Sequence, residues 1–313
     1  MNVLVTGGAG FIGSHIVDAF ASRGDHVTIL DNLSTGSTDN VNPKAEFVRG
    51  DITDAELVHR LFRERRFDIV NHHAAQLDVR KSVADPVFDC QQNIIGSLNL
   101  LEAAKEIGTV KRFMLASTGG AIYGEQDYFP ADEKHPTRPI SPYGVAKRSI
   151  ELYLHYYEQV HGIPYVAFRY TNVYGPRQSP HGEAGVVAIF TERLLDGTDC
   201  TINGDGTQTR DYVYVGDVVR AHMLALDKLS GSDIFNISTG TETDVNEIFQ
   251  VLSELTTNGE AEAKHGPAKA GEQQRSVCSY AYAEQKLGWQ PQMTLIEGLR
   301  ETVDYFQRKS VEA

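Results

Sequence analysis

The chain has 313 residues, of which 41% are apolar, and a formal net charge of −13 at pH 7. This length and apolar content indicate a globular protein with one large domain and a smaller lobe, and they exclude a disordered chain. The acidic balance argues against a nucleic-acid-binding or membrane-surface protein, so neither partner is expected.

The cysteines Cys90, Cys200 and Cys278 lie far apart and form no C-x-x-C motif. This spacing predicts neither a disulfide framework nor a zinc site. The paired His72 and His73 have no carboxylate and histidine set at ligand spacing, so no metal is expected. The first expected strand begins directly after the initial methionine, which leaves no room for a signal peptide, and no apolar run approaches the ~18 residues of a membrane helix. We therefore predict a cytoplasmic protein.

Residues 2–31 have the pattern of a dinucleotide-binding segment. A short apolar strand is followed by glycines at positions 7, 8, 10 and 13, and then by a helical pattern. This arrangement presents backbone N–H groups and the positive end of a helix dipole to a phosphate. A second strand, 26–30, ends at Asp31, and an acid about 20 residues beyond the glycines can accept hydrogen bonds from a ribose.

Strand and helix patterns alternate along the next part of the chain. Strands are expected at 46–50, 67–71, 110–116 and 163–169, and helices at 53–66, 86–108 and 142–161. This alternation predicts an α/β fold with right-handed βαβ units, a doubly wound parallel sheet and ligands at the carboxyl ends of its strands. Asp31, Asp51, Ala74 and Ser117 are expected at that edge.

Capping residues mark two of the expected helix starts. Thr53, with Glu56 three residues later, forms the pattern of a capping box. Ser141 followed by Pro142 is typical of an N-cap with proline at the first helical position. From residue 172 the pattern loosens, and glycine- and proline-containing pieces alternate with expected helices at 186–195, 216–229, 243–255 and 295–309. This part predicts a smaller C-terminal lobe.

Tyr143 and Lys147 are the candidate catalytic pair, because an i, i+4 spacing places both side chains on one helix face. A tyrosine with its usual pKa of ~10 is a poor base at neutral pH. A nearby ammonium group and a cationic nicotinamide would stabilise the phenolate and lower that pKa. Ser117 and Thr118 follow a strand end, where a hydroxyl could relay a proton between a substrate and Tyr143 or simply cap the backbone.

Five segments resemble motifs of the extended short-chain dehydrogenase/reductase superfamily. They are the glycine segment 6–15, Asp31-Asn32-Leu33, the Tyr143 and Lys147 pair, and the segments 169–176 and 210–217. Within this superfamily the chain is most similar, over essentially its whole length, to the UDP-glucose 4-epimerase family. The resemblance implies a Rossmann domain over 1–170, with returning segments near 210–240, and a nucleotide-sugar-binding α/β lobe over 171–313.

The resemblance also implies which residues hold NAD. Asp31 and Asn32 would bind the adenosine ribose, and Asp51 and Ile52 would flank the adenine. The other cofactor residues implied are Gly7, Gly10, Phe11, Ile12, Gly13, Leu33, Ser34, Ala74, Ala75, Gln76, Asn93, Tyr143, Lys147 and Tyr170. No arginine follows Asp31 directly, and its carboxylate would repel a 2′-phosphate, so NAD is expected rather than NADP.

For a UDP-sugar substrate, the resemblance implies Arg210 as the cation that binds the pyrophosphate, a role that suits a guanidinium group. The other substrate residues implied are Thr118, Asn172, Val186, Asn203, Lys269 and Arg275. Three positions depart from the family pattern. Gly119 stands where many relatives have serine, Lys269 stands where the family has arginine, and Asn203 stands where relatives often have an aromatic or apolar residue.

The implied reaction inverts C4 of UDP-galactose to give UDP-glucose through a 4-keto sugar, with Tyr143 as the base. Alternatives are 4-epimerisation of UDP-glucuronate or UDP-N-acetylglucosamine, and 4,6-dehydration. Dehydration needs an acid and a base after the relay threonine, where this chain has Gly119 and Gly120. A non-catalytic NAD sensor would need the loss of the tyrosine and lysine pair. The resemblance further implies a homodimer, with helices 86–108 and 142–161 forming a bundle across the two-fold axis.

Overall fold

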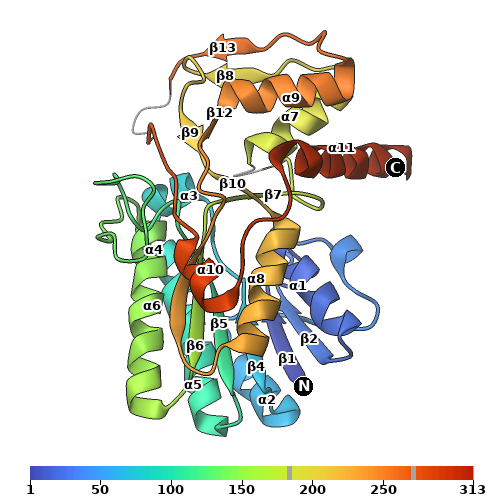
Figure 1. Cartoon of the computed structure of the whole chain (residues 1–313). Helices are drawn as coiled ribbons and strands as arrows, with labels where there is room; N and C mark the ends of the chain where they lie inside the picture. Colours follow the sequence, from blue (N-terminus) through green and yellow to red (C-terminus); the bar gives the residue numbers. More distant parts are fainter. Residues whose placement is uncertain (182–184, 269–272, 313) are drawn as a thin grey trace. The chain divides into compact units, whose positions relative to one another are not determined.

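The computed structural model describes residues 1–181, 185–268 and 273–312 (Figure 1). The chain divides into two compact units, each made of several stretches. Unit 1 comprises Met1–Gly124, Pro136–Arg169 and Val219–Phe235. Unit 2 comprises Glu125–His135, Tyr170–Val218 and Asn236–Ala313. No helix within the described ranges is long and apolar enough to cross a bilayer.

A seven-stranded sheet has the strand order β11-β6-β5-β4-β1-β2-β3. The strands are β1 (Asn2–Thr6), β2 (His26–Asp31), β3 (Glu46–Arg49), β4 (Ile69–His72), β5 (Arg112–Thr118), β6 (Tyr165–Tyr170) and β11 (Asp233–Ile237). β1 pairs in parallel with β2 on one side and with β4 on the other. The chain passes from β1 to β2 and β3 and then returns to β4, so the strand order reverses between β1 and β4. Such a switch point is where α/β sheets bind ligands.

Helices cover both faces of this sheet, as predicted. α2 (Ala55–Arg65), α5 (Gly96–Ile107) and α6 (Pro142–His161) share one core cluster with strand residues such as Val70 and Ala167. Neighbouring strand residues point to the opposite face. There Phe168 stacks on His222 of α8 (Val215–Lys228), with ring centroids 4.0 Å apart. α1 (Phe11–Ser22) follows β1.

The predicted helix 86–108 is divided by a π-helical turn. α4 (Pro86–Cys90) continues into η2 (Gln91–Ile95), a π segment, and then into α5. A short helix, α3 (Val79–Ala84), precedes α4. The π segment buries Asn93. Such segments often occur at functional sites.

Helix α2 begins differently from the predicted capping box. Its N-cap is Asp54, whose side chain accepts a hydrogen bond from the backbone N–H of Leu57 at 3.0 Å. Thr53 instead donates its N–H and hydroxyl to the Asp51 carboxylate, each at 2.8 Å. An aspartate caps a helix as well as a threonine does, and Asp51 engages the threonine.

Unit 2 is built from short strand pairs and helices. Its elements are β7 (Asn172–Tyr174), α7 (Val186–Leu195), β8 (Thr201–Asn203), β9 (Thr209–Arg210), β10 (Tyr212–Tyr214), β12 (Thr243–Asp244), α9 (Val245–Thr257), β13 (Lys264–Gly266), α10 (Ala281–Leu287) and α11 (Leu295–Glu312). A separate 3-10 turn, η1 (Thr38–Asn40), belongs to unit 1. β10 pairs with β7, β12 with β9 and β13 with β8. α7, α9 and α11 contribute Phe190, Phe249 and Leu299 to its core.

The segment Glu125–His135, which the sequence assigned to the first domain, clusters with unit 2. Its backbone explains the difference, because Ala131 N–H donates to the Val277 carbonyl at 3.0 Å. Glu133 also accepts the backbone N–H of Asn236 at 2.7 Å. Long-range hydrogen bonds of this kind have no local sequence signal.

Candidate active site

The glycine loop between β1 and α1 forms a tight cradle at the switch point. Gly7 has a φ of +68°, and a Cβ atom there would lie 2.6 Å from the backbone nitrogen of Ala74. A Cβ atom at Gly13 would lie 2.2 Å from the carbonyl oxygen of Gly7. α1 starts after Gly10 with no side-chain cap and no acidic residue in its first turn. Its first N–H groups are therefore available for an anion, which fits the pyrophosphate of a dinucleotide.

Two carboxylates lie beside this cradle at the ends of β2 and β3. Asp31 accepts backbone hydrogen bonds from Ala9 at 3.0 Å and from Leu33 at 2.8 Å, so it ties the glycine loop to the loop after β2. Asn32 donates its side-chain N–H to Asp51 at 2.7 Å. Burial raises the pKa of Asp51, but hydrogen bonds from Thr53 and Asn32 outweigh it and leave the pKa lowered. The expected ribose and adenine residues therefore form one connected group.

Gln76 and Asn93 lock the segment after β4 to the π turn. The Gln76 N–H donates to the Asn93 side-chain oxygen at 2.8 Å, and the Asn93 amide donates back to the Gln76 carbonyl at 2.9 Å. Asp89 accepts from both side chains, at 3.0 Å from Gln76 and 2.9 Å from Asn93. The structure thus brings two expected cofactor residues together and adds Asp89, which the sequence analysis missed.

Tyr143 and Lys147 lie one turn apart near the start of α6. Ser141 caps this helix by accepting the Gly144 N–H at 3.1 Å, and Pro142 occupies its first turn. The Lys147 ammonium donates to the Ala116 carbonyl of β5 at 2.9 Å and lies 5.8 Å from the centre of the Tyr143 ring. Lys147 therefore contacts the backbone near the carboxyl end of β5, and the catalytic role of the pair stays a prediction.

Burial and nearby carboxylates shift the pKa values of this pair. Burial raises the pKa of Tyr143 above its usual value, and the Asp89 carboxylate raises it further. Burial lowers the pKa of Lys147 to about 8, against the opposing effect of Asp89 and Glu151. The lowering of the Tyr143 pKa by Lys147 together with a cationic nicotinamide stays a prediction.

The two candidate relay hydroxyls at the end of β5 have different surroundings. Ser117 donates its hydroxyl to the buried Glu151 at 2.7 Å. Glu151 also binds Arg169 through two nitrogens, at 2.9 and 2.7 Å. The Thr118 oxygen accepts the Ala121 N–H at 3.1 Å, which leaves its hydroxyl proton free to be donated elsewhere. This geometry favours Thr118 as the relay.

His72 is a second residue that the sequence analysis did not place in the site. Its ring nitrogens lie 2.7 Å from the Thr6 hydroxyl and 2.8 Å from the Ser97 hydroxyl. Ser97 donates its proton to the Asn93 carbonyl, so it accepts from His72, and Thr6 in turn donates to His72. Burial lowers the pKa of His72 well below 6.5, which keeps the ring neutral. His72 on β4 thus connects β1 with α5, and Ser97 continues the connection to the Asn93 carbonyl in the π turn.

The expected substrate residues of unit 2 lie on its short strands and first helix. Arg210 ends β9, and the next residue, Asp211, offers its carbonyl to the Asn172 N–H at 2.9 Å. Thr209 N–H donates to the Gln274 carbonyl at 2.9 Å, so the backbone next to Arg275 lies beside the backbone next to Arg210. Asn203 and Val186 lie at the end of β8 and the start of α7. Tyr170, which was predicted to contact the cofactor, lies at the end of β6 and belongs to unit 2.

Of the other two candidate basic residues for the substrate, the structure describes Arg275. Arg275 forms a bidentate ion pair with Glu242, at 3.0 and 2.6 Å, and lies over the Phe129 ring at 4.0 Å. Lys269 lies outside the described residues. Within the described ranges, no group of three histidine, cysteine, aspartate or glutamate side chains could hold a metal ion.

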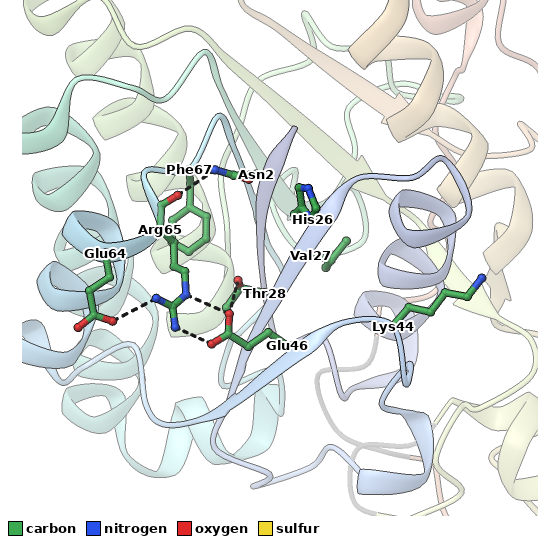
Figure 2. Close-up of a pocket in the computed structure, with 9 residues that line it drawn as sticks. All are labelled: Asn2, His26, Val27, Thr28, Lys44, Glu46, Glu64, Arg65 and Phe67. Atoms are coloured by element: carbon green, nitrogen blue, oxygen red, sulfur yellow. Dashed lines mark hydrogen bonds and ion pairs between the residues drawn. The ribbon is translucent and has the colours of Figure 1, made fainter.

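A hollow of about 360 Å³ lies at the opposite end of the strands, next to the first residues of β1 and β2 (Figure 2). Arg65 occupies it and pairs with Glu46 at 2.7 Å and with Glu64 at 3.4 Å. Asn2 donates its side-chain N–H to the Arg65 carbonyl at 3.0 Å. Arg65 is thus paired with both glutamates, and the hollow has neither the glycine cradle nor the Tyr143 and Lys147 pair of the candidate site.

Comparison with known proteins agrees with this geometry. The model of the NAD dependent epimerase/dehydratase family matches residues 3–238. A UDP-glucose 4-epimerase of Mycolicibacterium smegmatis is 42% identical over 99% of this chain and 100% of its own. A crystal structure of a Thermotoga maritima UDP-glucose 4-epimerase with UDP-glucose is 50% identical, covers 99% of this chain and 100% of its own, and has a TM-score of 0.96. The Thermus thermophilus UDP-glucose 4-epimerase in complex with NAD is 48% identical, covers 98% of this chain and 99% of its own, and has a TM-score of 0.92. The chain belongs to the NAD dependent epimerase/dehydratase family.

Proposed function

We propose that this protein is an NAD-dependent UDP-glucose 4-epimerase that converts UDP-galactose to UDP-glucose. The observation that carries the proposal is the placement of Tyr143, Lys147 and Thr118 in the same compact unit as the glycine cradle. The identities of 42–50% to UDP-glucose 4-epimerases over nearly the whole chain support the same activity.

The residues of unit 1 suit the two proton transfers of this reaction. Tyr143 as phenolate takes the proton of the sugar 4-hydroxyl and later returns it, while the Thr118 hydroxyl relays the proton. The Lys147 ammonium, fixed on the Ala116 carbonyl, holds positive charge near the phenolate. The glycine cradle and Asp31 would hold NAD, which would supply the reversible hydride chemistry at C4. The fixed helix and strand positions of these groups supply orientation.

The residues of unit 2 suit the nucleotide part of the substrate. Arg210 would bind the pyrophosphate, and Asn172 and Asn203 would contribute amide contacts. Both Asp211 oxygens already accept hydrogen bonds, from Thr239 at 2.8 Å and from the Gly240 N–H at 3.0 Å.

A test of the proposal is proton NMR of the purified protein with UDP-galactose and no added NAD. We expect UDP-glucose to appear, because a cofactor that is restored in every cycle stays bound. Tyr143→Phe should abolish turnover while NAD remains bound. The matched control is Tyr156→Phe on the same helix, where the side chain is 47% exposed. Absence of UDP-glucose with the wild-type protein would contradict the proposal, and UDP-glucuronate and UDP-N-acetylglucosamine in the same assay rank the alternative sugars.

We also infer a cytoplasmic homodimer. The three cysteines are free thiols, in keeping with a reducing compartment. α4, η2 and α6 expose large apolar side chains, with Val87 66%, Ile95 45%, Leu152 54% and Val160 59% exposed. An apolar surface of this kind on adjacent helices is typical of an oligomer interface.

A further inference from the structure

Asp89 is a buried carboxylate with one unsatisfied oxygen. The residue is fully buried on α4, and its Oδ1 accepts the side-chain N–H groups of Gln76 and Asn93. Its buried Oδ2 has no hydrogen-bond partner among the described residues. A buried charge without full hydrogen bonding is costly. Such a group is expected to have a functional role that offsets this cost.

Asp89 lies next to the start of α6. α4 packs against α6. Asp89 lines a hollow of about 530 Å³ together with Pro142, Val145 and Ala146 from the first turns of α6, the part of the helix that also carries Tyr143. The Tyr143 N–H donates to the Ser82 hydroxyl at 3.2 Å. Ser82 belongs to α3, which ends at Ala84, and the next residue, Asp85, is the N-cap of α4. The backbone of Tyr143 is thus held by the helix directly before the one that carries Asp89.

The other charged groups near the pair are already compensated. Glu151 on α6 is bound by Arg169, at 2.7 Å, and by Arg148, at 3.0 Å. Burial holds His72 and His73 neutral by lowering their pKa values, that of His73 to about 3. On α3, the exposed Lys81 lies over the Phe88 ring at 4.5 Å. Both Glu151 and Asp89 raise the pKa of Lys147, but Glu151 is paired with arginines, whereas Asp89 forms no ion pair within the described residues.

We propose that Asp89 is a positioning residue for the reaction: its carboxylate holds Gln76 and Asn93 in place and presents an uncompensated negative charge to Tyr143 and Lys147. This inference rests on the proposed function, because it assigns Asp89 a role in the same proton transfer. The charge keeps the tyrosine protonated and the lysine charged when no positive ring is nearby. A cationic nicotinamide would neutralise that effect, so Tyr143 would become a base only when oxidised NAD is bound.

The test is the pH profile of UDP-galactose turnover in Asp89→Asn. The asparagine keeps an oxygen for Gln76 and Asn93 but removes the charge. Because Asp89 raises the pKa values of both Tyr143 and Lys147, the acid and alkaline limbs of the profile should both move to lower pH, by roughly one unit. Cys90→Ser, a change at the exposed neighbouring position, should leave both limbs in place. Reduced activity with unmoved limbs would overturn the proposal. Asp89→Ser carries the same test if the asparagine variant does not fold.

A second measurement does not need turnover. In protein labelled with ¹³C-lysine, the Lys147 side chain should titrate near pH 8 in the wild type and at lower pH in Asp89→Asn. Lys147→Arg identifies its signal by removing it. An unchanged Lys147 titration in the Asp89 variant would overturn the proposal. Absence of turnover in the wild type would contradict the proposed function alone, because this titration still decides the role of Asp89.

Discussion

At the scale of single residues, Ser117 and Thr118 show how two adjacent hydroxyls take different roles. Thr118→Ala should reduce turnover by about 10²- to 10⁴-fold, the usual range for a positioned proton-transfer group. Ser117→Ala should instead lower the free energy of unfolding by about 1–3 kcal/mol, because the buried Glu151 loses a donor. Initial rates and urea unfolding of both variants check this division.

One outcome of these measurements would reverse the roles assigned to Ser117 and Thr118. If Ser117→Ala lost more turnover than Thr118→Ala at equal folded fraction, Ser117 would be the relay. The sequence could not separate the two residues, because both follow the same strand end. Only the hydrogen-bond partners of the two hydroxyls distinguish them. Ser117 donates to Glu151, which lies on a helix 34 positions later in the chain.

At the scale of elements, local chemistry determined what the sequence could predict. Helix α6 begins and ends where expected, because Ser141 and Pro142 mark its start and Gly162, with a φ of +68°, marks its end. The π turn was not predicted, because an inserted helical residue leaves the apolar pattern of 86–108 almost unchanged. Asp89 and Asn93 meet Gln76 through that turn, so their cluster was not predicted either.

The apolar face of α6 carries a prediction about assembly. Leu152→Asp places a charge on a side chain that is 54% exposed in the single chain. If this face forms a homodimer, light scattering should give twice the chain mass for the wild type and the chain mass for the variant. Ile296→Asp on α11, equally exposed at 54%, is the control and should leave the mass unchanged. A wild-type protein with the chain mass would contradict the dimer.

At the scale of the whole molecule, the core of unit 1 contains three histidines that burial keeps neutral. His73 lies 2.8 Å from Asn71, which donates to His222 at 3.0 Å, and His72 bridges Thr6 and Ser97. Burial lowers the pKa of each, and the charge of Lys147 lowers those of His72 and His73 further. The partners of these histidines lie on β1, β4, α5 and α8 and could not be identified from the sequence.

These histidines predict that the chain loses stability as pH falls. In the unfolded chain they take up protons near pH 6.5, whereas in the folded chain they stay neutral, so stability is full above 6.5 and falls below it. Each should contribute a loss of about 1.4 kcal/mol between pH 7.5 and 5.5. Burial raises the pKa of Asp211 to about 6, so proton uptake by Asp211 stabilises the folded chain as pH falls. This opposite effect on stability is the same in all the variants. Urea unfolding at both pH values should therefore show a loss smaller by about 1.4 kcal/mol in His222→Gln than in the wild type. His155→Gln, at an exposed position, should match the wild type, and an equal loss in all three proteins would show that His222 is protonated in the folded chain.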